Sequence, residues 1–483
     1  MKGQERAPLW EALRAHVAAG YTGFHVPGHK GKHMPGELSA AWGRDVFAYD
    51  LTELPGLDNL HAPEGAIKEA QELAAQLYGA RHTFFLVGGT SAGLIAALLA
   101  ATQPGDKVLL PRHAHRSLLS AMILGDLKPV FYPAAVDPKW GVVAGWDQEA
   151  ALRLIDRHED ARALVLVHPT YHGLVGPAAE LIQAAQKAGL TVIADEAHGP
   201  HFYFHPDFPA GALQLGADAA AQSTHKLLGS LTQSSWLHLG TERISPQRVA
   251  EALRWLESSS PSYLLLASLD LARRRAAQRG REDWERARQL AGELSSALLT
   301  IPSIGVWSEL PPAAVERDRC KVTISVSDLG ITGPEAAFYL QRQHKIQVEL
   351  VELDTLLFVV TPADDKGSVQ MAVQAVAELA QQRRPGASGP RALPSIPAIT
   401  EGTLLPRAAA YAGHRTVPLG QAVGRIAAQA VVPYPPGVPL VWPGEEFTPQ
   451  TVEVLAIYVR LGIPVQGIAQ NENQRLGVAV VEE

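Results

Sequence analysis

The stretch Thr191-Val-Ile-Ala-Asp-Glu-Ala-His198 has an apolar run that ends in two acidic residues. A short β-branched run of this kind predicts a buried strand, with Asp195 at its carboxyl end. Further along, Gln222-Ser-Thr-His-Lys226 follows a second apolar run and ends in a lysine. Ligands of open parallel sheets bind beyond the carboxyl ends of the strands. Asp195 and Lys226 are therefore predicted to face a common ligand.

The pattern around these two runs predicts an α/β domain from about Ala66 to Ser260. Short apolar runs alternate with helical stretches, which is typical of a mainly parallel sheet covered by helices on both faces. The predicted strands are Thr83–Val87, Lys107–Leu110, Pro129–Tyr132, Ala163–Val167, Thr191–Ala194 and Ala219–Gln222. The predicted helices are Ala66–Tyr78, which Gly79 ends, and Ser91–Ala101, Arg116–Leu124 and Ala178–Ala188.

The rest of the chain divides by composition. We expect an N-terminal arm over 1–65 with a short helix near Leu9–Val17, a large domain over 66–270, a small α/β domain over 271–382, a linker rich in Pro, Gly and Ser over 383–402, and a C-terminal domain over 403–483. Two charged helices, Leu264–Ala277 and Arg281–Leu299, are predicted after the α/β stretch that ends at Ser260. A second α/β-like stretch, around Lys321–Val326 and Ile346–Val360, follows them.

The composition is that of an ordinary globular protein, with 47% hydrophobic and 19% charged residues. The net charge of −7 gives no reason to expect a nucleic-acid partner. A single cysteine, Cys320, fits a reducing compartment. The N-terminus lacks the apolar region of a secretory signal, and the longest apolar stretch is far shorter than the roughly 20 residues of a membrane span. We therefore expect a cytoplasmic location and no membrane partner.

Lys226 and Asp195 together suit one cofactor, pyridoxal 5'-phosphate (PLP). A lysine held near a cofactor and away from bulk water can have its pKa lowered enough to form a Schiff base. An aspartate beside the pyridine nitrogen keeps that nitrogen protonated, so that the ring accepts electrons. Taken singly, Lys226 could be a surface lysine and Asp195 a helix cap, but both lie at predicted strand ends.

A glycine-rich turn supplies a phosphate site. Gly88-Gly-Thr-Ser-Ala-Gly93 lies between a predicted strand and a predicted helix. Backbone N–H groups at a helix N-terminus, with the hydroxyls of Thr90 and Ser91, bind anions.

Two other motifs suggest different functions. Asp195-Glu-Ala-His198 spells a box found in some helicases, but that function requires an upstream G-x-x-x-x-G-K-[ST] loop. The nearest candidate, around Gly31-Lys-His33, has Val26 in place of the first glycine and histidine in place of Ser or Thr. An NTPase is therefore not expected.

His25, His29 and His33 are spaced four apart, which suggests a metal site. Pro27 and nearby glycines break any helix there, and no carboxylate or thiolate accompanies the histidines in the sequence. We expect no metal site, and a structured loop near the active site instead.

Taken together, the motifs resemble the Orn/Lys/Arg decarboxylase family of fold type I PLP enzymes over nearly the whole chain. The resemblance lies in Val26-Pro-Gly-His-Lys-Gly31, Leu57-Asp-Asn-Leu-His-Ala-Pro-Glu-Gly65, Ser260-Pro-Ser-Tyr-Leu-Leu-Leu-Ala-Ser-Leu-Asp270, Leu231-Thr-Gln233, Gly424-Arg-Ile426, Tyr434-Pro-Pro-Gly-Val-Pro439 and Pro443-Gly-Glu445. The chain lacks the extra N-terminal wing of longer members and resembles the short branch, which includes arginine decarboxylases.

The resemblance implies a role for each site residue. Lys226 would form the Schiff base and Asp195 would bind the pyridinium nitrogen. His115 matches a histidine that stacks on the cofactor ring, and His225 precedes the lysine. The phosphate-binding hydroxyls would be those of Thr90, Ser91, Ser223 and Ser259. Ser259 would reach the phosphate from a neighbouring subunit, which implies at least a homodimer.

The chain departs from the family at four positions. Gly88 stands where many members have Asn, and Gln429 replaces a common Glu. His113 and Arg116, on either side of the stacking histidine, stand where the family often has Asn and Lys. These departures put substrate preference in doubt more than chemistry.

The implied reaction is decarboxylation of a basic amino acid to agmatine, cadaverine or putrescine and CO₂. Arginine is favoured by the short-branch likeness alone. Two alternatives remain: another fold type I activity (an aminotransferase or lyase), and a non-catalytic, regulatory PLP-binding protein.

Overall fold

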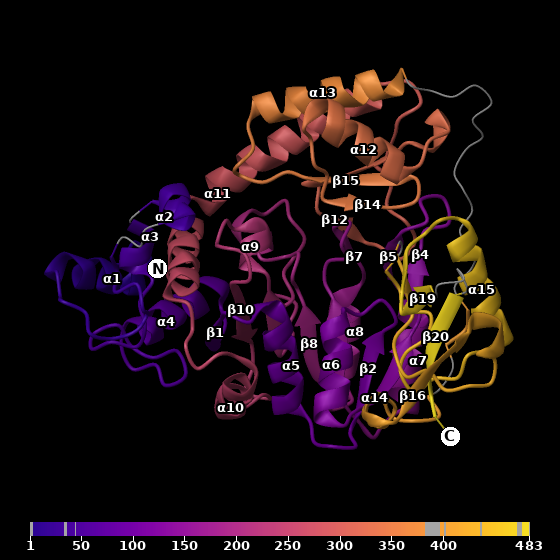
Figure 1. Ribbon diagram of the computed structural model, residues 1–483, viewed down its shortest axis with the longest axis horizontal. Coiled ribbons are helices and arrows are strands. Elements are labelled where there is room, and N and C mark those ends of the chain that lie inside the picture. Colours follow the sequence, from indigo (N-terminus) through magenta and orange to yellow (C-terminus); the bar gives the residue numbers. More distant parts are fainter. Residues whose placement is uncertain are drawn as a thin grey trace. The chain divides into compact units, whose positions relative to one another are not determined.

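The computed structural model describes residues 3–32, 36–43, 45–381, 397–399, 402–434, 437–470 and 476–482. The chain forms two compact units: one made of 1–101 and 191–283, the other of 102–190 and 284–483. Figure 1 shows their helices and strands and labels many of them. The predicted linker falls almost wholly outside the described residues.

The first unit holds most of the predicted site residues. Its elements are α1 (Pro8–Ala19), α2 (Glu37–Trp42), α3 (Asp45–Tyr49), α4 (Ala66–Tyr78), β1 (His82–Leu86), α5 (Gly89–Ala101), β8 (Thr191–Asp195), the 3₁₀ helix η1 (Phe202–Phe204), β9 (Ala219–Gln222), α9 (Thr224–Leu227), β10 (Ser235–Leu239), α10 (Pro246–Leu256) and the first part of α11 (Tyr263–Leu299). Strands β8 and β9 are parallel, whereas β10 pairs antiparallel with both β9 and β1. Asp195 pairs with Ala221, so both strands end at the same edge.

The second unit holds three further parts. Strands β2 (Lys107–Pro111), β3 (Lys128–Tyr132) and β6 (Ala161–Val167) are parallel, with β2 between the other two. An antiparallel sheet follows, in the order β11 (Gly305–Val306), β13 (Lys321–Ser325), β15 (Thr355–Val359) and β14 (Leu350–Val351). The C-terminal part has the sheet β16 (His414–Pro418), β20 (Leu476–Val481) and β19 (Ile468–Gln470).

The remaining elements of this unit connect these sheets. They are α6 (Arg116–Gly125), β4 (Ala134–Val136), β5 (Val143–Trp146), α7 (Gln148–Arg157), β7 (Leu174–Val175), α8 (Ala178–Lys187), β12 (Glu316–Arg317), η2 (Ser327–Leu329), α12 (Gly333–His344), α13 (Lys366–Ala380), α14 (Pro406–Tyr411), η3 (Leu419–Gln421), β17 (Val432–Pro433), α15 (Pro449–Arg460) and β18 (Val465–Gln466).

The predicted fold class is confirmed: the main sheet has seven strands in the order β1-β10-β9-β8-β6-β2-β3 and is mainly parallel. Each of the six strands predicted between residues 66 and 260 appears within two residues of its expected bounds, whereas the stretch Ile346–Val360 contains two short strands, β14 and β15. Helix α4 ends at Gly79 with a left-handed φ of 68°. Strand β10 was not predicted, because His238 interrupts its apolar pattern; the structure buries that histidine completely.

The two predicted charged helices are one helix, α11, and the prediction of a break was wrong. Gly280 lies inside the helix, where a Cβ atom would come within 3.0 Å of Cβ of Phe204. The glycine therefore allows Phe204 to pack closely against the helix. It does not end the helix.

The N-terminal arm is more ordered than expected, since it contains α1, α2 and α3. The apolar face of α1 explains its attachment, because Leu9 and Leu13 are fully buried in the core of the first unit together with Ile67 and Leu266. Among the described residues, no helix is both long and apolar enough to cross a membrane.

Candidate active site

Lys226 lies in the short helix α9, four residues beyond the end of β9. Its Nζ atom is 2.9 Å from Nε2 of His198, in a hydrogen bond. His198 follows β8 by three residues, and Asp195, the last residue of β8, is buried and accepts a hydrogen bond from the N–H of Ala197 at 3.3 Å. The ends of two neighbouring parallel strands therefore bring together the amine, the imidazole and the segment that carries the carboxylate.

A cluster of buried hydroxyls lies at the start of α5. Oγ1 of Thr90 is hydrogen-bonded to Oγ of Ser223 at 2.6 Å and to Oγ of Ser235 at 3.0 Å. The helix has 13 residues, so its N-terminus carries the partial positive charge that attracts anions. Ser91, also in the first turn, is partly exposed. The predicted phosphate residues Thr90, Ser91 and Ser223 thus lie at one helix N-terminus or in contact with it.

The loop before α5 explains why glycine stands at position 88. The N–H groups of Val87 and Gly88 donate to Oε1 of Glu257 at 3.0 and 2.8 Å. A Cβ atom at Gly88 would lie 3.0 Å from Cβ of Ala92 and 3.1 Å from the Glu257 oxygen. Burial raises the pKa of Glu257, and the two N–H groups oppose that rise. Glu257 was missed by the sequence analysis because it lies about 170 residues away from the loop that it holds.

Glu196, the residue after β8, belongs to a buried chain of hydrogen bonds that runs through the three strands β9, β10 and β1. Its Oε2 accepts from Nε2 of Gln222 at 2.7 Å, and the Gln222 Oε1 is 3.1 Å from Nε2 of His238. Nδ1 of His238 is 2.7 Å from Oγ1 of Thr83. An amide oxygen only accepts, so Nε2 of His238 carries the proton and the ring is neutral.

The environment shifts the pKa values along this chain. Burial raises the pKa of Glu196 to about 7, although Gln222, Ala212 and Tyr203 all donate to its carboxylate. Burial also lowers the pKa of His238 to about 3. Glu196 is fully buried and satisfied by these donors. Glu196, the second residue of the helicase-like box, is thus a buried structural residue.

His225 and His115 have defined local partners. The ring of His225 bonds the carbonyl oxygen of Ser234 through Nδ1 at 2.9 Å, which leaves Nε2 as an acceptor. Burial lowers the pKa of His225, the bond to Ser234 opposes this, and the charge of Lys226 lowers it further. His115 caps α6 in the second unit, since the N–H of Ser117 donates to its Nδ1 at 3.2 Å. Its stacking on a cofactor ring stays a prediction.

The other predicted positions lie in different surroundings. Ser259 is exposed in the loop between α10 and α11. Burial lowers the pKa of His113 to about 4, so the histidine at this departure from the family pattern is neutral. Arg116 and Gln429 are exposed.

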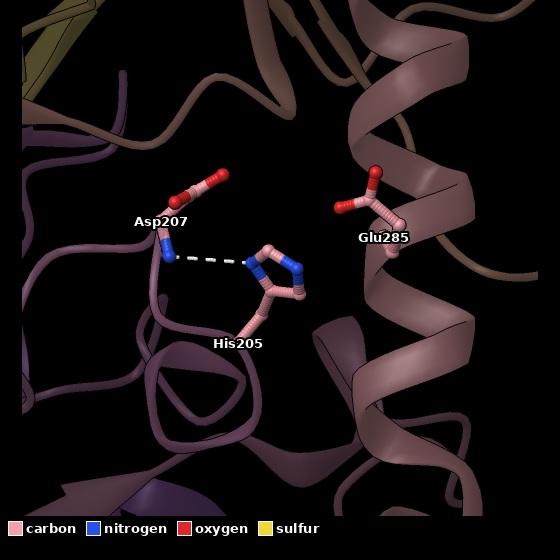
Figure 2. A group of neighbouring side chains, drawn as sticks. All are labelled: His205, Asp207 and Glu285. Carbon is pink, nitrogen blue, oxygen red and sulfur yellow. Dashed lines mark hydrogen bonds between the residues drawn. The ribbon is translucent and has the colours of Figure 1, made fainter.

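The histidines considered for a metal site have other partners. Nε2 of His29 is 3.1 Å from Oδ2 of Asp50, a carboxylate that the sequence did not associate with it. Nδ1 of His25 is 2.6 Å from the carbonyl oxygen of Val26, and His33 lies outside the described residues. A separate histidine, His205, accepts a hydrogen bond from the N–H of Asp207 at 3.2 Å (Figure 2).

Glu445, from the quoted signature Pro443-Gly-Glu445, forms a buried ion pair with Arg112. The guanidinium of Arg112 donates to both oxygens of Glu445 at 2.5 and 2.6 Å, and to the carbonyl oxygens of Pro439 and Leu440. Both side chains are 4% exposed, so neither charge is accessible to a substrate. These residues therefore hold parts of the second unit together.

The α/β fold, with its mainly parallel seven-stranded sheet, matches the class of fold type I PLP-dependent enzymes. The family model of the Orn/Lys/Arg decarboxylase major domain matches residues 7–368, and that of the C-terminal domain matches 405–461. The chain is 39% identical over 472 residues to an arginine decarboxylase of Bacillus subtilis (strain 168), covering 96% of each chain. It is 39% identical over 469 residues to an arginine decarboxylase of Bacillus anthracis, covering 96% of this chain and 95% of the relative.

Solved structures agree in fold. The constitutive lysine decarboxylase of E. coli matches with a TM-score of 0.86 at 21% identity, over 99% of this chain and 82% of that chain. The protein belongs to the Orn/Lys/Arg decarboxylase family. It is a basic amino acid decarboxylase, and family membership implies PLP as its cofactor.

The donor set of the first unit fits PLP. An amine, a buried carboxylate at a strand end, and hydroxyls at a helix N-terminus match the aldehyde, the pyridine nitrogen and the phosphate. Sequence reasoning assigned no role to Ser235 or His198. Ser235 lies on the strand that was not predicted, and His198 had been quoted only as part of the helicase-like box.

Proposed function

We propose that this protein decarboxylates arginine to agmatine and CO₂. The observation that carries the proposal is the hydrogen bond between Nζ of Lys226 and Nε2 of His198. His198 lies three residues after Asp195 in the sequence. The choice of arginine rests on the relatives, since two that match nearly full length at 39% identity are named arginine decarboxylases.

The residues of the first unit would hold the cofactor. Lys226 would bind PLP covalently through Nζ, and Asp195 would keep the pyridine nitrogen protonated. Thr90, Ser91 and Ser223 would bind the phosphate, and the Ser235 hydroxyl bonded to Thr90 supports that group. When bound, PLP supplies the electron sink that accepts the electron pair left by departing CO₂.

The protein's part in the reaction is to orient the substrate and to move protons. The substrate carboxylate must stand perpendicular to the cofactor ring, a positioning task that lowers the barrier by fixing geometry. Lys226 or His225 would then deliver a proton to Cα. His115 would stack on the cofactor ring.

The active unit would be a homodimer or larger homo-oligomer with shared sites, in which Ser259 reaches the phosphate of the neighbouring subunit. The exposed position of Ser259 supports this assignment. The protein would work in the cytoplasm. The proposed domains remain those given by the sequence: 1–65, 66–270, 271–382, 383–402 and 403–483.

A substrate panel tests the proposal. Purified protein loaded with PLP is incubated separately with arginine, lysine and ornithine, and CO₂ and the product amine are measured. We expect agmatine and CO₂ in equal amounts from arginine, and much less product from the other two. A keto acid without CO₂ would indicate an aminotransferase, and no turnover of any substrate would support a non-catalytic protein.

A further inference from the structure

The side chain of His198 contacts the amine of Lys226. It is 8% exposed and follows Asp195 in the loop after β8, and its Nε2 is 2.9 Å from Nζ. We propose that His198 is the base that removes a proton from Lys226, so that the amine can bond to an aldehyde cofactor. This inference rests on the proposed function, because it concerns the loading of the same site.

The need for a base follows from the charge of lysine. An ordinary lysine has a pKa of about 10.4, so only about one in 2,500 is neutral at pH 7. An ammonium nitrogen has no electron pair with which to attack a carbonyl carbon. A histidine of ordinary pKa, about 6.5, is mostly neutral at pH 7 and can accept the proton. The contact between the two nitrogens is short enough for direct transfer.

Other groups near α9 are less suited to this role. His225 directs Nδ1 to the carbonyl of Ser234, and no hydrogen bond joins its ring to Lys226 among those that the structure gives. Glu196 is fully buried, and its carboxylate is used by Gln222, Tyr203 and Ala212. His198 is therefore the base whose ring nitrogen contacts Nζ.

The chemical step balances. Nζ of the ammonium gives one proton to Nε2 of His198 and becomes a neutral amine. The amine attacks the aldehyde carbon of PLP, a carbon–nitrogen double bond forms, and the carbonyl oxygen leaves as water with the two remaining Nζ hydrogens. The imidazolium later returns its proton when Lys226 is released as an ammonium.

The test measures attachment of the cofactor, separately from turnover. Apoprotein is mixed with saturating PLP in a buffer that contains no amine. Attachment is followed by visible absorbance and by borohydride trapping, with mass spectrometry of the Lys226 peptide. The variants are His198→Ala and His198→Gln, and glutamine retains a polar side chain but cannot take up the proton. His205→Ala is the matched control, because His205 bonds a backbone N–H and not Lys226 in the described contacts.

We expect both His198 variants to attach PLP about 100-fold more slowly than the wild type, the lower end of the usual contribution of a general base. Added imidazole should speed the His198→Ala reaction, more strongly for more basic imidazoles, and should leave the wild type and His205→Ala unchanged. A purely structural role would give no such rescue. Melting curves of the apoproteins verify folding, and His198→Gln serves as the test if His198→Ala does not fold.

Two results would overturn the inference: attachment at the wild-type rate in both His198 variants, or slow attachment that imidazole does not change. These differ from failure of the proposed function, in which the wild type itself does not attach PLP at Lys226 or releases no CO₂.

Discussion

At the scale of single residues, Asp195 and Glu196 are adjacent acids with opposite surroundings. Asp195 ends β8 and accepts one hydrogen bond, from the N–H of Ala197, among those that the structure gives, whereas the carboxylate of Glu196 accepts hydrogen bonds from three donors. The sequence identified Asp195 correctly as the last residue of a buried strand. It could not show that Glu196 is structural, because its partners lie 7 to 26 residues further along the chain.

Asp195→Asn should reduce kcat by about 100-fold or more while the protein still attaches PLP. A neutral amide cannot hold the pyridine nitrogen protonated, so the electron sink weakens. Steady-state kinetics and the visible spectrum of the loaded variant measure the two effects. Asp207→Asn, an exposed aspartate, is the control. Unchanged kcat in Asp195→Asn would argue against this role.

Glu196 should make stability depend on pH. Its pKa is about 7 in the folded state and about 4.5 when unfolded, so the folded state binds more protons between these values. The contribution of Glu196 to stability is therefore largest below about pH 4.5, and it is lost as pH rises to about 7. Relative to Glu196→Gln, the wild type should lose up to about 3 kcal/mol over this window, measured by urea unfolding. A constant difference between the two proteins across the window contradicts the assignment.

At the scale of elements, several family signatures turn out to be folding motifs. Asp58, in the signature 57–65, accepts hydrogen bonds from the N–H groups of Asn59, Glu64, Gly65, Ile67 and Lys68, and so caps α4. The hydroxyl of Tyr263, from the signature 260–270, donates to the carbonyl oxygen of Asp58 at 2.5 Å. In the same signature, Asp270 accepts from the N–H of Leu9 at 3.0 Å and so holds the start of α1.

Asp58→Ala should destabilise the protein by about 2–4 kcal/mol, because a helix cap and several backbone partners are lost together. Asp58→Asn should recover part of this loss. Asparagine tolerates the left-handed φ of 71° at this position and retains one acceptor oxygen. Chemical denaturation of the three proteins checks the order. An alanine variant as stable as the wild type would show that the cap contributes little.

Sequence patterns located the strand ends well and the sheet partners poorly. Periodicity placed β8, β9 and α5, and with them Asp195, Lys226 and Thr90, because each run is apolar and bounded by polar residues. It missed β10, where a fully buried histidine disrupts the pattern, and so missed Ser235. It divided α11 at Gly280, because the close packing of Phe204 that requires a glycine is a tertiary contact.

At the scale of the whole molecule, the main open question is assembly. Mixing two inactive variants tests for shared sites: Lys226→Ala lacks the amine, and Ser259→Trp would block the phosphate of the neighbouring site by its bulk. Refolding the two together at equal concentration should restore about a quarter of wild-type activity, since half of the dimers would be mixed and carry one intact site. Decarboxylation of arginine is the readout. Absence of recovery, or full activity of Ser259→Trp alone, contradicts a shared site.

The central claim is that Lys226 holds the cofactor. The most direct measurement is peptide mapping by mass spectrometry of PLP-loaded protein after borohydride reduction, with and without prior addition of arginine. We predict one modified lysine, Lys226, whose modification falls when arginine is added, because the substrate amine displaces Nζ. Modification of a different lysine, or of Lys226 to no greater extent than surface lysines, would contradict the account.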